Sequence, residues 1–339
     1  MPKYLLSRTD SIRFWIVVAS FLSLILLLMG GCGSEGQSSP SSATGDAVIV
    51  QNAGRTLSFP EAPDRVVTLN QNATEMFLAL GLEDRMVGTA FKDDPILPRF
   101  REEYKKIPVL AEKYPSLEVL LDADPDFVYG FDSAFAPPKG PATLERLDQL
   151  GITAYVDPMF YGEPGLTLEE VHEEIRTLGR IFRIEDRADS LVRNLQSDIR
   201  SIRSRIPDDA DTIDVAIYDS GQETMYTAGS TLINDMLNTV GARNVFRDEI
   251  HDAWSPISWE KLVEENPDFI LVMDYGNVTA EEKIEFLEGK SSLQAVRAIR
   301  EENFVVLPLS TTFVGVRNVQ ALRILAEGFY LNVEFTEDK

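Results

Sequence analysis

The chain has 339 residues, of which 44% are hydrophobic and 26% are charged, and its formal net charge at pH 7 is −23. This apolar content is enough for two ordinary domains and is not typical of a disordered chain. The strong negative charge excludes nucleic acid as an expected partner, because proteins that bind nucleic acid neutralise its phosphates with Lys and Arg.

The first residues are typical of an export signal. Basic residues precede an unbroken apolar run over residues 14–29, and Gly30-Gly31-Cys32 follows. The run covers about 16 residues, fewer than the about 20 that a helix needs to span a bilayer. Small residues before a lone cysteine resemble a bacterial lipobox, although Met29 stands where leucine is commoner. We therefore expect a lipoprotein signal peptide over residues 1–31 and a lipid on Cys32, which anchors the protein to the cell membrane on its exported face, at the cell surface or in the periplasm.

A flexible tether is expected after the lipid anchor, over residues 32–45. Residues 33–45, GSEGQSSPSSATG, have no apolar periodicity and are rich in Gly, Ser and Pro. Because Cys32 is the single cysteine of the chain, the exported part cannot form an internal disulfide. It must be stabilised by its hydrophobic core alone.

The next segments predict a parallel β–α–β unit. Residues 65–69, RVVTL, are β-branched and apolar, and they lead into a helix for which Asn72 is a possible N-cap with Glu75 as its N3 partner. Apolar residues recur at helical spacing up to Gly81, which can end the helix in a left-handed conformation. Residues 86–90 predict a second strand. In such units the loops after the strands face a ligand crevice.

The most informative feature of the chain is an internal repeat. Residues 116–127, SLEVLLDADPDF, align without gaps to residues 258–269, SWEKLVEENPDF, and six of the twelve pairs are identical. Each copy predicts a short helix capped by serine, a break at Pro-Asp and an apolar strand. Residues 233–246 parallel, more weakly, the helix that ends at Gly81 and the strand after it. The chain is therefore expected to contain two related α/β lobes.

A long helical pattern separates the two lobes. It begins at Thr167 and continues to Ile206, with apolar residues on one face and charged residues on the other. We predict one long, stiff connecting helix and only small lobe movements on binding. The expected organisation is an N-terminal α/β lobe over residues 46–165, a connecting helical segment over residues 166–206 and a C-terminal α/β lobe over residues 207–339, with mainly parallel sheets.

Several segments together resemble the helical-backbone class of binding proteins, which serve ABC importers for ferric siderophores, cobalamin or heme. They include residues 65–88, 115–128, 227–246 and 254–272, and the match spans nearly all of residues 64–330. The resemblance implies a binding protein, not an enzyme, with its ligand between two lobes that dock onto a permease dimer. In this class the glutamate of each repeat helix meets permease arginines, which implies docking roles for Glu118 and Glu260. An acidic residue in the first turn also simply favours the helix dipole, by about 0.3–1 kcal/mol.

Residues that follow the predicted strands are the candidates for ligand binding. Amides from the first loop can bond a polar ligand, unless Asn72 only caps the helix and its neighbours solvate a turn. Exposed aromatic residues in loops are typical of binding sites. The candidates of the first lobe are Asn70, Gln71, Phe91, Lys92, Tyr129, Phe131 and Tyr161. The resemblance places Tyr226, Trp254, Tyr275 and Arg317 of the second lobe near the ligand.

Arg317 is the sharpest of these candidates, because a guanidinium pairs bidentately with carboxylate or catecholate oxygens. Lys92 and Arg317 would suit an anionic chelate, and aromatic faces would suit its organic part. A ferric siderophore is therefore the leading ligand, with cobalamin and heme as alternatives. For heme iron, Tyr129, Tyr161, Tyr226 and Tyr275 each offer a phenolate, and the sequence does not select among them.

Other functional classes fit the sequence less well. The chain has two histidines, His172, expected on the surface of the connecting helix, and His251, beside the Trp254 loop. They do not make the site of three or four ligands that a bare metal ion needs. The motifs G-x-S-x-G, H-E-x-x-H and the phosphate and dinucleotide loops are absent, so a carboxylate-based hydrolase is a remote alternative. We expect a monomer without a cofactor or a protein metal site.

Overall fold

The computed structural model describes residues 47–160, 165–207 and 210–330, and all of them belong to one compact unit, Thr44–Lys339. The predicted signal peptide, the tether, Cys32 and Tyr161 lie outside the described residues. Within the described part, no helix combines the length and the apolar character needed to cross a membrane.

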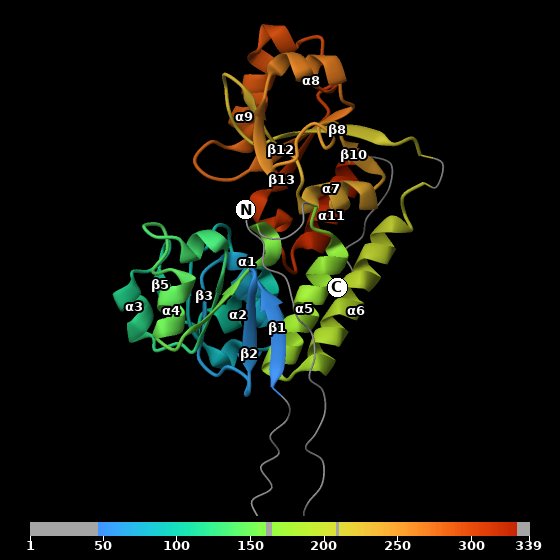
Figure 1. The fold of residues 1–339 in the computed structure, drawn as a ribbon. Coiled ribbons are helices and arrows are strands. Elements are labelled where there is room, and N and C mark those ends of the chain that lie inside the picture. The colour runs from blue at the N-terminus through green and yellow to red at the C-terminus, as the bar shows by residue number, and fades with distance from the viewer. Residues whose placement is uncertain (1–46, 161–164, 208–209, 331–339) are drawn as a thin grey trace, which may run out of the picture. The chain divides into compact units, whose positions relative to one another are not determined.

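The first lobe is built on a five-stranded parallel sheet with the strand order β5-β4-β3-β6-β7 (Figure 1). A hairpin of β1 and β2 joins this sheet through the side chain of Asn52, which bonds both backbone groups of Val156 in β7. The strands are β1 (Val48–Asn52), β2 (Arg55–Phe59), β3 (Val66–Thr68), β4 (Met86–Ala90), β5 (Val109–Ala111), β6 (Phe127–Gly130) and β7 (Thr153–Val156). The helices are α1 (Gln71–Ala79), α2 (Arg101–Tyr104), α3 (Leu117–Asp122) and α4 (Leu144–Gln149), with short 3₁₀ turns η1 (Glu83–Arg85), η2 (Pro98–Phe100), η3 (Asp132–Phe135) and η4 (Pro158–Phe160).

The second lobe contains a four-stranded parallel sheet with the order β10-β8-β12-β13 and a separate antiparallel ribbon of β9 and β11. Its strands are β8 (Ile213–Tyr218), β9 (Met225–Ala228), β10 (Ala242–Asn244), β11 (Trp254–Ile257), β12 (Phe269–Asp274) and β13 (Phe304–Pro308). Its helices are α7 (Leu232–Thr239), α8 (Trp259–Glu265), α9 (Ala280–Gly289), α10 (Arg297–Arg300) and α11 (Asn318–Phe329), with 3₁₀ turns η5 (Ser291–Leu293) and η6 (Leu309–Thr312). Matching β4, β3, β6 and β7 with β10, β8, β12 and β13 superposes the two strand orders. The predicted two-lobe fold with mainly parallel sheets is confirmed.

The internal repeat folds in the same way in both lobes. Helices α3 and α8 are each followed by a residue in the left-handed conformation, Asp124 with φ 48° and Asn266 with φ 46°. The next carboxylate then accepts hydrogen bonds from backbone N–H groups that precede or begin the central strand of its own sheet. Asp126 accepts from the two residues before β3, and Asp268 accepts from Asp214 in β8. The repeat therefore ties each outer helix to the middle of its sheet.

The predicted single connecting helix is wrong in detail, because the segment forms two helices, α5 (Leu168–Phe182) and α6 (Glu185–Arg203), which lie side by side (Figure 1). Thr167 caps α5 in a capping box, as its position predicts, but the chain reverses at Arg183, whose φ is 59°. Gly179 permits the close packing, since a Cβ there would lie 2.4 Å from that of Ala188. His172 is buried, contrary to the expected surface position, because α5 packs against α6, β1 and α7.

The largest hydrophobic cluster is continuous through both lobes and the connecting helices. It contains Phe77 of α1, Phe182 of α5, Leu237 of α7 and Leu325 of α11, all almost fully buried. Burial of apolar surface is the dominant stabilising term in folding. The two lobes therefore share one core along the side where α5 and α6 lie, and the loops after the strands remain free to line a site.

Candidate functional site

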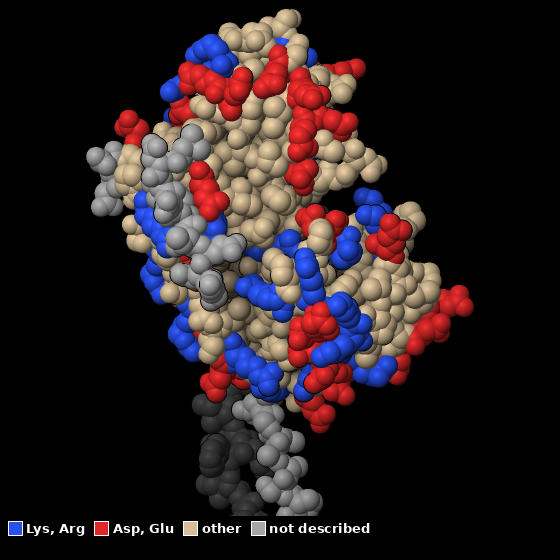
Figure 2. Space-filling model, turned by 180° about the vertical axis from the view of Figure 1, so that it is seen from behind, with Lys and Arg blue, Asp and Glu red and all other residues tan. Residues whose placement is uncertain are grey.

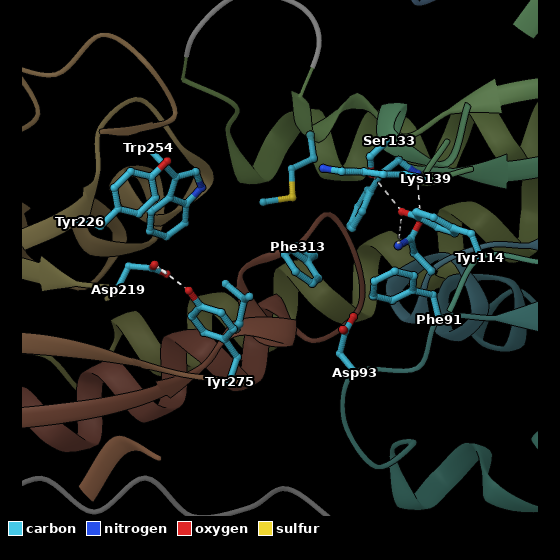
Figure 3. Close-up of a pocket in the computed structure, with 14 residues that line it drawn as sticks. Phe91, Asp93, Tyr114, Ser133, Lys139, Asp219, Tyr226, Trp254, Tyr275 and Phe313 are labelled. Atoms are coloured by element: carbon cyan, nitrogen blue, oxygen red, sulfur yellow. Dashed lines mark hydrogen bonds between the residues drawn. The ribbon is translucent and has the colours of Figure 1, made fainter. Parts of the chain in front are cut away.

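A pocket with a volume of about 530 Å³ lies between the two lobes (Figure 3). This volume is within the range of about 300–1,000 Å³ that is typical of small-molecule sites. Most of the lining residues stand in loops that follow parallel strands, as expected for this architecture. What we call the first wall consists of Asn70, Phe91, Asp93, Tyr114, Phe131, Ser133, Lys139 and Met159, and the second wall consists of Asp219, Tyr226, Trp254, Tyr275, Leu309 and Phe313.

The first wall is organised by a hydrogen-bond network. The Nδ2 of Asn70 lies 3.2 Å from the hydroxyl of Tyr114, and this hydroxyl lies 3.0 Å from the Oγ of Ser133. The Oδ1 of Asn70 accepts from the backbone N–H of Phe131 at 2.9 Å. Burial raises the pKa of Tyr114, so its hydroxyl stays neutral and can both donate and accept. Asn70 therefore links the loops after β3, β5 and β6 into one preformed surface.

The loop after β4 carries Phe91, whose ring lies 4.7 Å from that of Tyr114 (centroid to centroid) and whose backbone has φ 56°. A left-handed conformation at an aromatic residue is strained and persists where its surroundings hold it. Gln71 supplies this hold, because its Oε1 accepts from the backbone N–H groups of Asp93 and Asp94 at 2.9 and 2.6 Å. Gln71 thus supports the pocket from behind and does not line it. Lys92 is exposed and also does not line it.

The predicted N-cap of α1 is also placed differently. The N-cap is Asn70, and Asn72 lies inside the helix, where its Nδ2 donates to Asp157 Oδ2 at 2.8 Å and to the carbonyl of Val314 at 2.9 Å. The idea that Asn72 only caps the helix is therefore wrong. Its side chain joins the first lobe to the loop before α11 in the second lobe.

The second wall combines two aromatic rings from the ribbon with a hydrogen-bonded carboxylate. Tyr226 in β9 and Trp254 in β11 are diagonal neighbours on one face of the ribbon, and their rings are stacked, with centroids 6.4 Å apart and an interplanar angle of 17°. Asp219 follows β8, and its Oδ2 accepts from the hydroxyl of Tyr275 at 2.7 Å and from the Oγ of Ser220 at 2.8 Å. Burial and the bond to Asp219 raise the pKa of Tyr275 to about 12, so its hydroxyl is a neutral donor.

The two walls meet in an aromatic contact. The ring of Phe131 from the first lobe packs edge to face against that of Phe313 from the second lobe, with centroids 5.1 Å apart and an interplanar angle of 74°. Aromatic pairs of this geometry are favourable beyond the area they bury. The contact joins the two lobes beside the pocket, and Figure 3 shows Phe313 between the labelled residues of the two walls.

Arg317 does not line the pocket, contrary to the prediction. Its guanidinium forms a bidentate pair with Glu75, with Nε 2.6 Å from Oε2 and Nη2 2.7 Å from Oε1, and Nη2 also donates to the carbonyl of Pro95 at 2.7 Å. The side chains are 8% and 0% exposed. The predicted geometry of a bidentate carboxylate contact is present, but the carboxylate belongs to α1 of the first lobe. Arg317 is therefore an interlobe tie.

The prediction that Tyr129 lines the ligand site is also wrong, because its side chain is fully buried in the core of the first lobe. Its hydroxyl lies 3.2 Å from Asp157 Oδ2 and 3.1 Å from Glu174 Oε1, and the hydroxyl of Tyr155 donates to Glu174 Oε2 at 3.0 Å. Burial raises the pKa of Asp157 to about 7, that of Glu174 to about 8 and that of Tyr129 well above its usual range. Tyr129 cannot serve as a phenolate ligand in this state.

Of the predicted ligand-binding residues, six stand in the pocket lining: Asn70, Phe91, Phe131, Tyr226, Trp254 and Tyr275. His251 is exposed and is not in the lining. The other eight lining residues were not among the candidates: Asp93, Tyr114, Ser133, Lys139, Met159, Asp219, Leu309 and Phe313. Asp219 was detectable, since it directly follows β8, whose sequence IDVAIY is rich in β-branched and apolar residues. In the ranges that the structure describes, no group of three or more His, Cys, Asp or Glu side chains is placed to hold a metal ion.

The two glutamates of the repeat helices, Glu118 and Glu260, are exposed in the first turns of α3 and α8. Neither forms an ion pair with another residue of the described part. Hydrogen bonds from its own backbone N–H and from Ser258 lower the pKa of Glu260, so it is ionised. Figure 2 shows that acidic side chains predominate on the second lobe of the face in view, while acidic and basic side chains mix on the first lobe.

A family model described as periplasmic binding protein matches residues 66–311. The chain belongs to this family. The resemblance inferred from the sequence is thereby confirmed, and the protein is a solute-binding protein and not an enzyme.

Individual relatives agree with this family. The chain is 27% identical over 321 residues to the uncharacterized ABC transporter substrate-binding lipoprotein YvrC of Bacillus subtilis, covering 91% of this chain and 95% of that protein. It is 24% identical over 220 residues to a vitamin B12-binding protein of Yersinia pseudotuberculosis, covering 64% of this chain and 72% of that protein. The crystal structure of a periplasmic binding protein from Veillonella parvula is similar with a TM-score of 0.76 and 31% identity, covering 84% of this chain and 97% of that one.

Proposed function

We propose that this protein is the substrate-binding component of an ABC importer and captures a ferric-siderophore-type metal chelate in the pocket between its lobes. It acts as a monomer without a cofactor of its own, is held at the exported face of the cell membrane by a lipid on Cys32, and passes its cargo to a permease dimer. The name of the Bacillus relative supports the importer class and the lipid anchor.

The composition of the pocket carries this proposal. Seven of its fourteen lining residues are aromatic, while the polar ones are few and are drawn from both lobes. A mainly apolar pocket with a few placed polar groups is typical of organic ligands. A metal chelate presents to the protein the organic shell that surrounds its metal. The pocket is therefore suited to the shell of a chelate.

Cobalamin is the second candidate, since one relative is named as a vitamin B12-binding protein. Heme is the third candidate, and among the described tyrosines predicted to offer a phenolate to its iron, Tyr226 is the one that is left in the pocket lining. Tyr129 is buried in the core, and the hydroxyl of Tyr275 donates to Asp219, which together with burial raises its pKa to about 12 and opposes iron ligation by phenolate.

A fluorescence titration tests the ligand class. Without residues 1–32, Trp254 and Trp259 are the two tryptophans of the chain, and Trp254 is in the second wall while Trp259 is buried and donates to the carbonyl of Gln222. We expect saturable quenching by one ligand from a panel of ferric hydroxamate, catecholate and citrate chelates, cobalamin and heme. The signal should be lost in Trp254→Phe and kept in Trp259→Phe. If no ferric chelate of the panel binds, the proposed cargo is wrong.

Docking is proposed to use Glu118 and Glu260, the exposed glutamates at matching positions of the two lobes. Reversal of both charges, Glu118→Lys with Glu260→Lys, should abolish ligand uptake by cells and leave ligand affinity unchanged. The matched control is Asp84→Lys with Glu285→Lys, which reverses one exposed acidic residue in each lobe away from the repeat helices. Equal uptake by the two double variants would contradict this division of roles.

A further inference from the structure

Asp219 lines the pocket, and one of its two carboxylate oxygens, Oδ1, accepts no hydrogen bond from the described residues. The residue is only 5% exposed, yet it lines the pocket. Both of its hydrogen bonds, from Tyr275 and Ser220, go to Oδ2. No residue in the described ranges donates to Oδ1 or forms an ion pair with this carboxylate. Burying a carboxylate is costly unless hydrogen bonds or charges compensate for the lost water, so Oδ1 is open to a donor from the cargo.

Lys283, a basic residue that interacts electrostatically with Asp219, already has other partners. It is buried, its Nζ donates to the carbonyl of Met273, and this nitrogen lies 4.5 Å from the centroid of the Tyr275 ring. Burial lowers the pKa of Lys283, while Asp219 and Asp274 act in the opposite direction. Lys283 therefore supports the Tyr275 ring from one side, and the ring in turn orients Asp219.

The aromatic rings of the second wall surround this carboxylate. Figure 3 shows Tyr226 and Trp254 on one side of Asp219 and Tyr275 on the other, all on the same side of the pocket. The faces of Trp and Tyr rings attract cations through the ring quadrupole, and recognition of ammonium groups by aromatic cages relies on this attraction. A carboxylate among such faces adds a charged acceptor for the same group. The four side chains have the chemistry of an ammonium-binding subsite.

The rest of the lining does not favour an anion. The described lining residues include two carboxylates, Asp93 and Asp219, one amine, that of Lys139, which is exposed, and no arginine. Lys92 and Arg317, the residues that would suit an anionic chelate, lie outside the lining. The second lobe is acidic over the face seen in Figure 2, and a field of this sign attracts cations.

We infer that the second wall binds a positively charged group of the cargo, so that the preferred substrate is a chelate with a pendant ammonium. This inference rests on the proposed function, of which it names the substrate class. The ammonium would donate to Oδ1 of Asp219 and lie against the faces of Tyr226 and Trp254, while the chelated metal and its shell occupy the space toward the first wall.

Three forms of one chelate test the inference on the mature protein. They are a linear ferric tris-hydroxamate with a pendant primary ammonium, its N-acetylated neutral form and its N-succinylated anionic form. We expect the ammonium form to bind at least tenfold more tightly than the neutral form, and the anionic form to bind most weakly. Asp219→Asn should remove the preference for the ammonium form, so that the ammonium and the neutral forms bind with about equal affinity. Equal affinities for the three forms would overturn the inference.

Two further variants separate recognition from folding. Tyr226→Leu removes an exposed ring without a described hydrogen bond to Asp219 and should also reduce the preference for the ammonium form. Asp252→Asn removes an exposed carboxylate of the loop before β11, outside the lining, and should leave all three affinities unchanged. If Asp252→Asn changes the preference as much as Asp219→Asn, the effect is one of general charge and the inference is wrong.

The failure of the inference is distinguishable from that of the proposed function. If none of the three chelates binds, the proposed cargo is wrong, and the protein is then titrated with a metal-free primary alkylammonium compound. Binding that is lost in Asp219→Asn would support the ammonium subsite without the chelate. If the alkylammonium also fails to bind, both proposals are wrong.

Discussion

The two lobes are alike on their outer helices and differ where they face each other. Helices α3 and α8 repeat the left-handed end, the anchoring aspartate and the exposed glutamate. The walls of the pocket do not repeat, since the first wall is centred on the amide of Asn70 and the second on the carboxylate of Asp219. The repeated surface thus maintains each sheet and a common outer face, and the pocket draws its selectivity from the unlike loops.

Helices α1 and α7 show the same contrast. Their methionines, Met76 and Met236, are fully buried at matching positions. The acidic residue one position earlier has a different partner in each lobe. Glu75 pairs with Arg317 of the second lobe, whereas Asp235 accepts from the backbone N–H of Leu168 at the start of α5, at 2.8 Å. Equivalent carboxylates therefore hold different interlobe segments, one by an ion pair and one by a helix cap.

The largest effect is expected from breaking the ion pair. Arg317→Met leaves the carboxylate of Glu75 buried without its counter-charge, which should lower the free energy of unfolding by about 3–5 kcal/mol. Asp235→Asn, the matched variant in α7, removes the charge from a half-buried hydrogen bond and should cost about 1 kcal/mol. Urea denaturation monitored by circular dichroism measures both. The double variant Glu75→Leu with Arg317→Met should recover much of the loss, and equal losses in the two single variants would refute the contrast.

The second expected effect is a pH dependence of the free energy of unfolding that originates in the first lobe. The buried pair Asp157 and Glu174 belongs to the first lobe and α5, and burial raises their pKa values to about 7 and about 8. A carboxyl group whose pKa is raised on folding stabilises the protein in its protonated form. This stability is fully present below the pKa of the unfolded chain and is lost as the pH rises toward the folded pKa.

The free energy of unfolding should therefore fall between about pH 4.5 and pH 8, by up to about 1.4 kcal/mol per pH unit for each titrating group. Glu174→Gln should flatten this dependence. Glu173→Gln, which changes the exposed neighbour on the same helix, should leave it unchanged. Denaturant titrations at four pH values measure the free energy of unfolding of the wild type and of both variants. A wild-type value that rises across this window would show that the pair is not buried as described.

The smallest effect concerns the caps of the repeat. Ser116 Oγ accepts from the backbone N–H of Val119 at 3.3 Å, whereas Ser258 makes no such bond to α8. Ser116→Ala should therefore cost about 1 kcal/mol, and Ser258→Ala less than about 0.5 kcal/mol. Thermal unfolding of the two variants measures the difference. The opposite order would mean that the two copies of the repeat are capped differently in solution.

Local sequence patterns predicted the architecture well because they reflect short-range rules. The strand at 86–90 and the repeat with its break before Pro125 and Pro267 were predicted from β-branched residues, glycine and proline at fixed offsets. The rule that ligands lie after parallel strands placed Asn70, Phe91 and Phe131 correctly in the pocket lining.

The errors came from partners that are distant in the sequence. The guanidinium of Arg317 meets a carboxylate 242 positions away, and no local pattern indicates that pairing. Tyr114 was missed because it follows β5, whose three residues are too few for a periodic signal. The turn at Arg183 was missed because both connecting helices have the same apolar period. The chain reverses direction between them, and the period of the apolar residues does not indicate this reversal.

The ribbon of β9 and β11 stands outside the four-stranded sheet of the second lobe, yet it carries Tyr226 and Trp254. Side chains on that face can be exchanged without altering the order of the parallel strands. The ribbon is thus a place where descendants of one ancestral binding protein can acquire new cargo preferences while their fold and their outer helices stay the same.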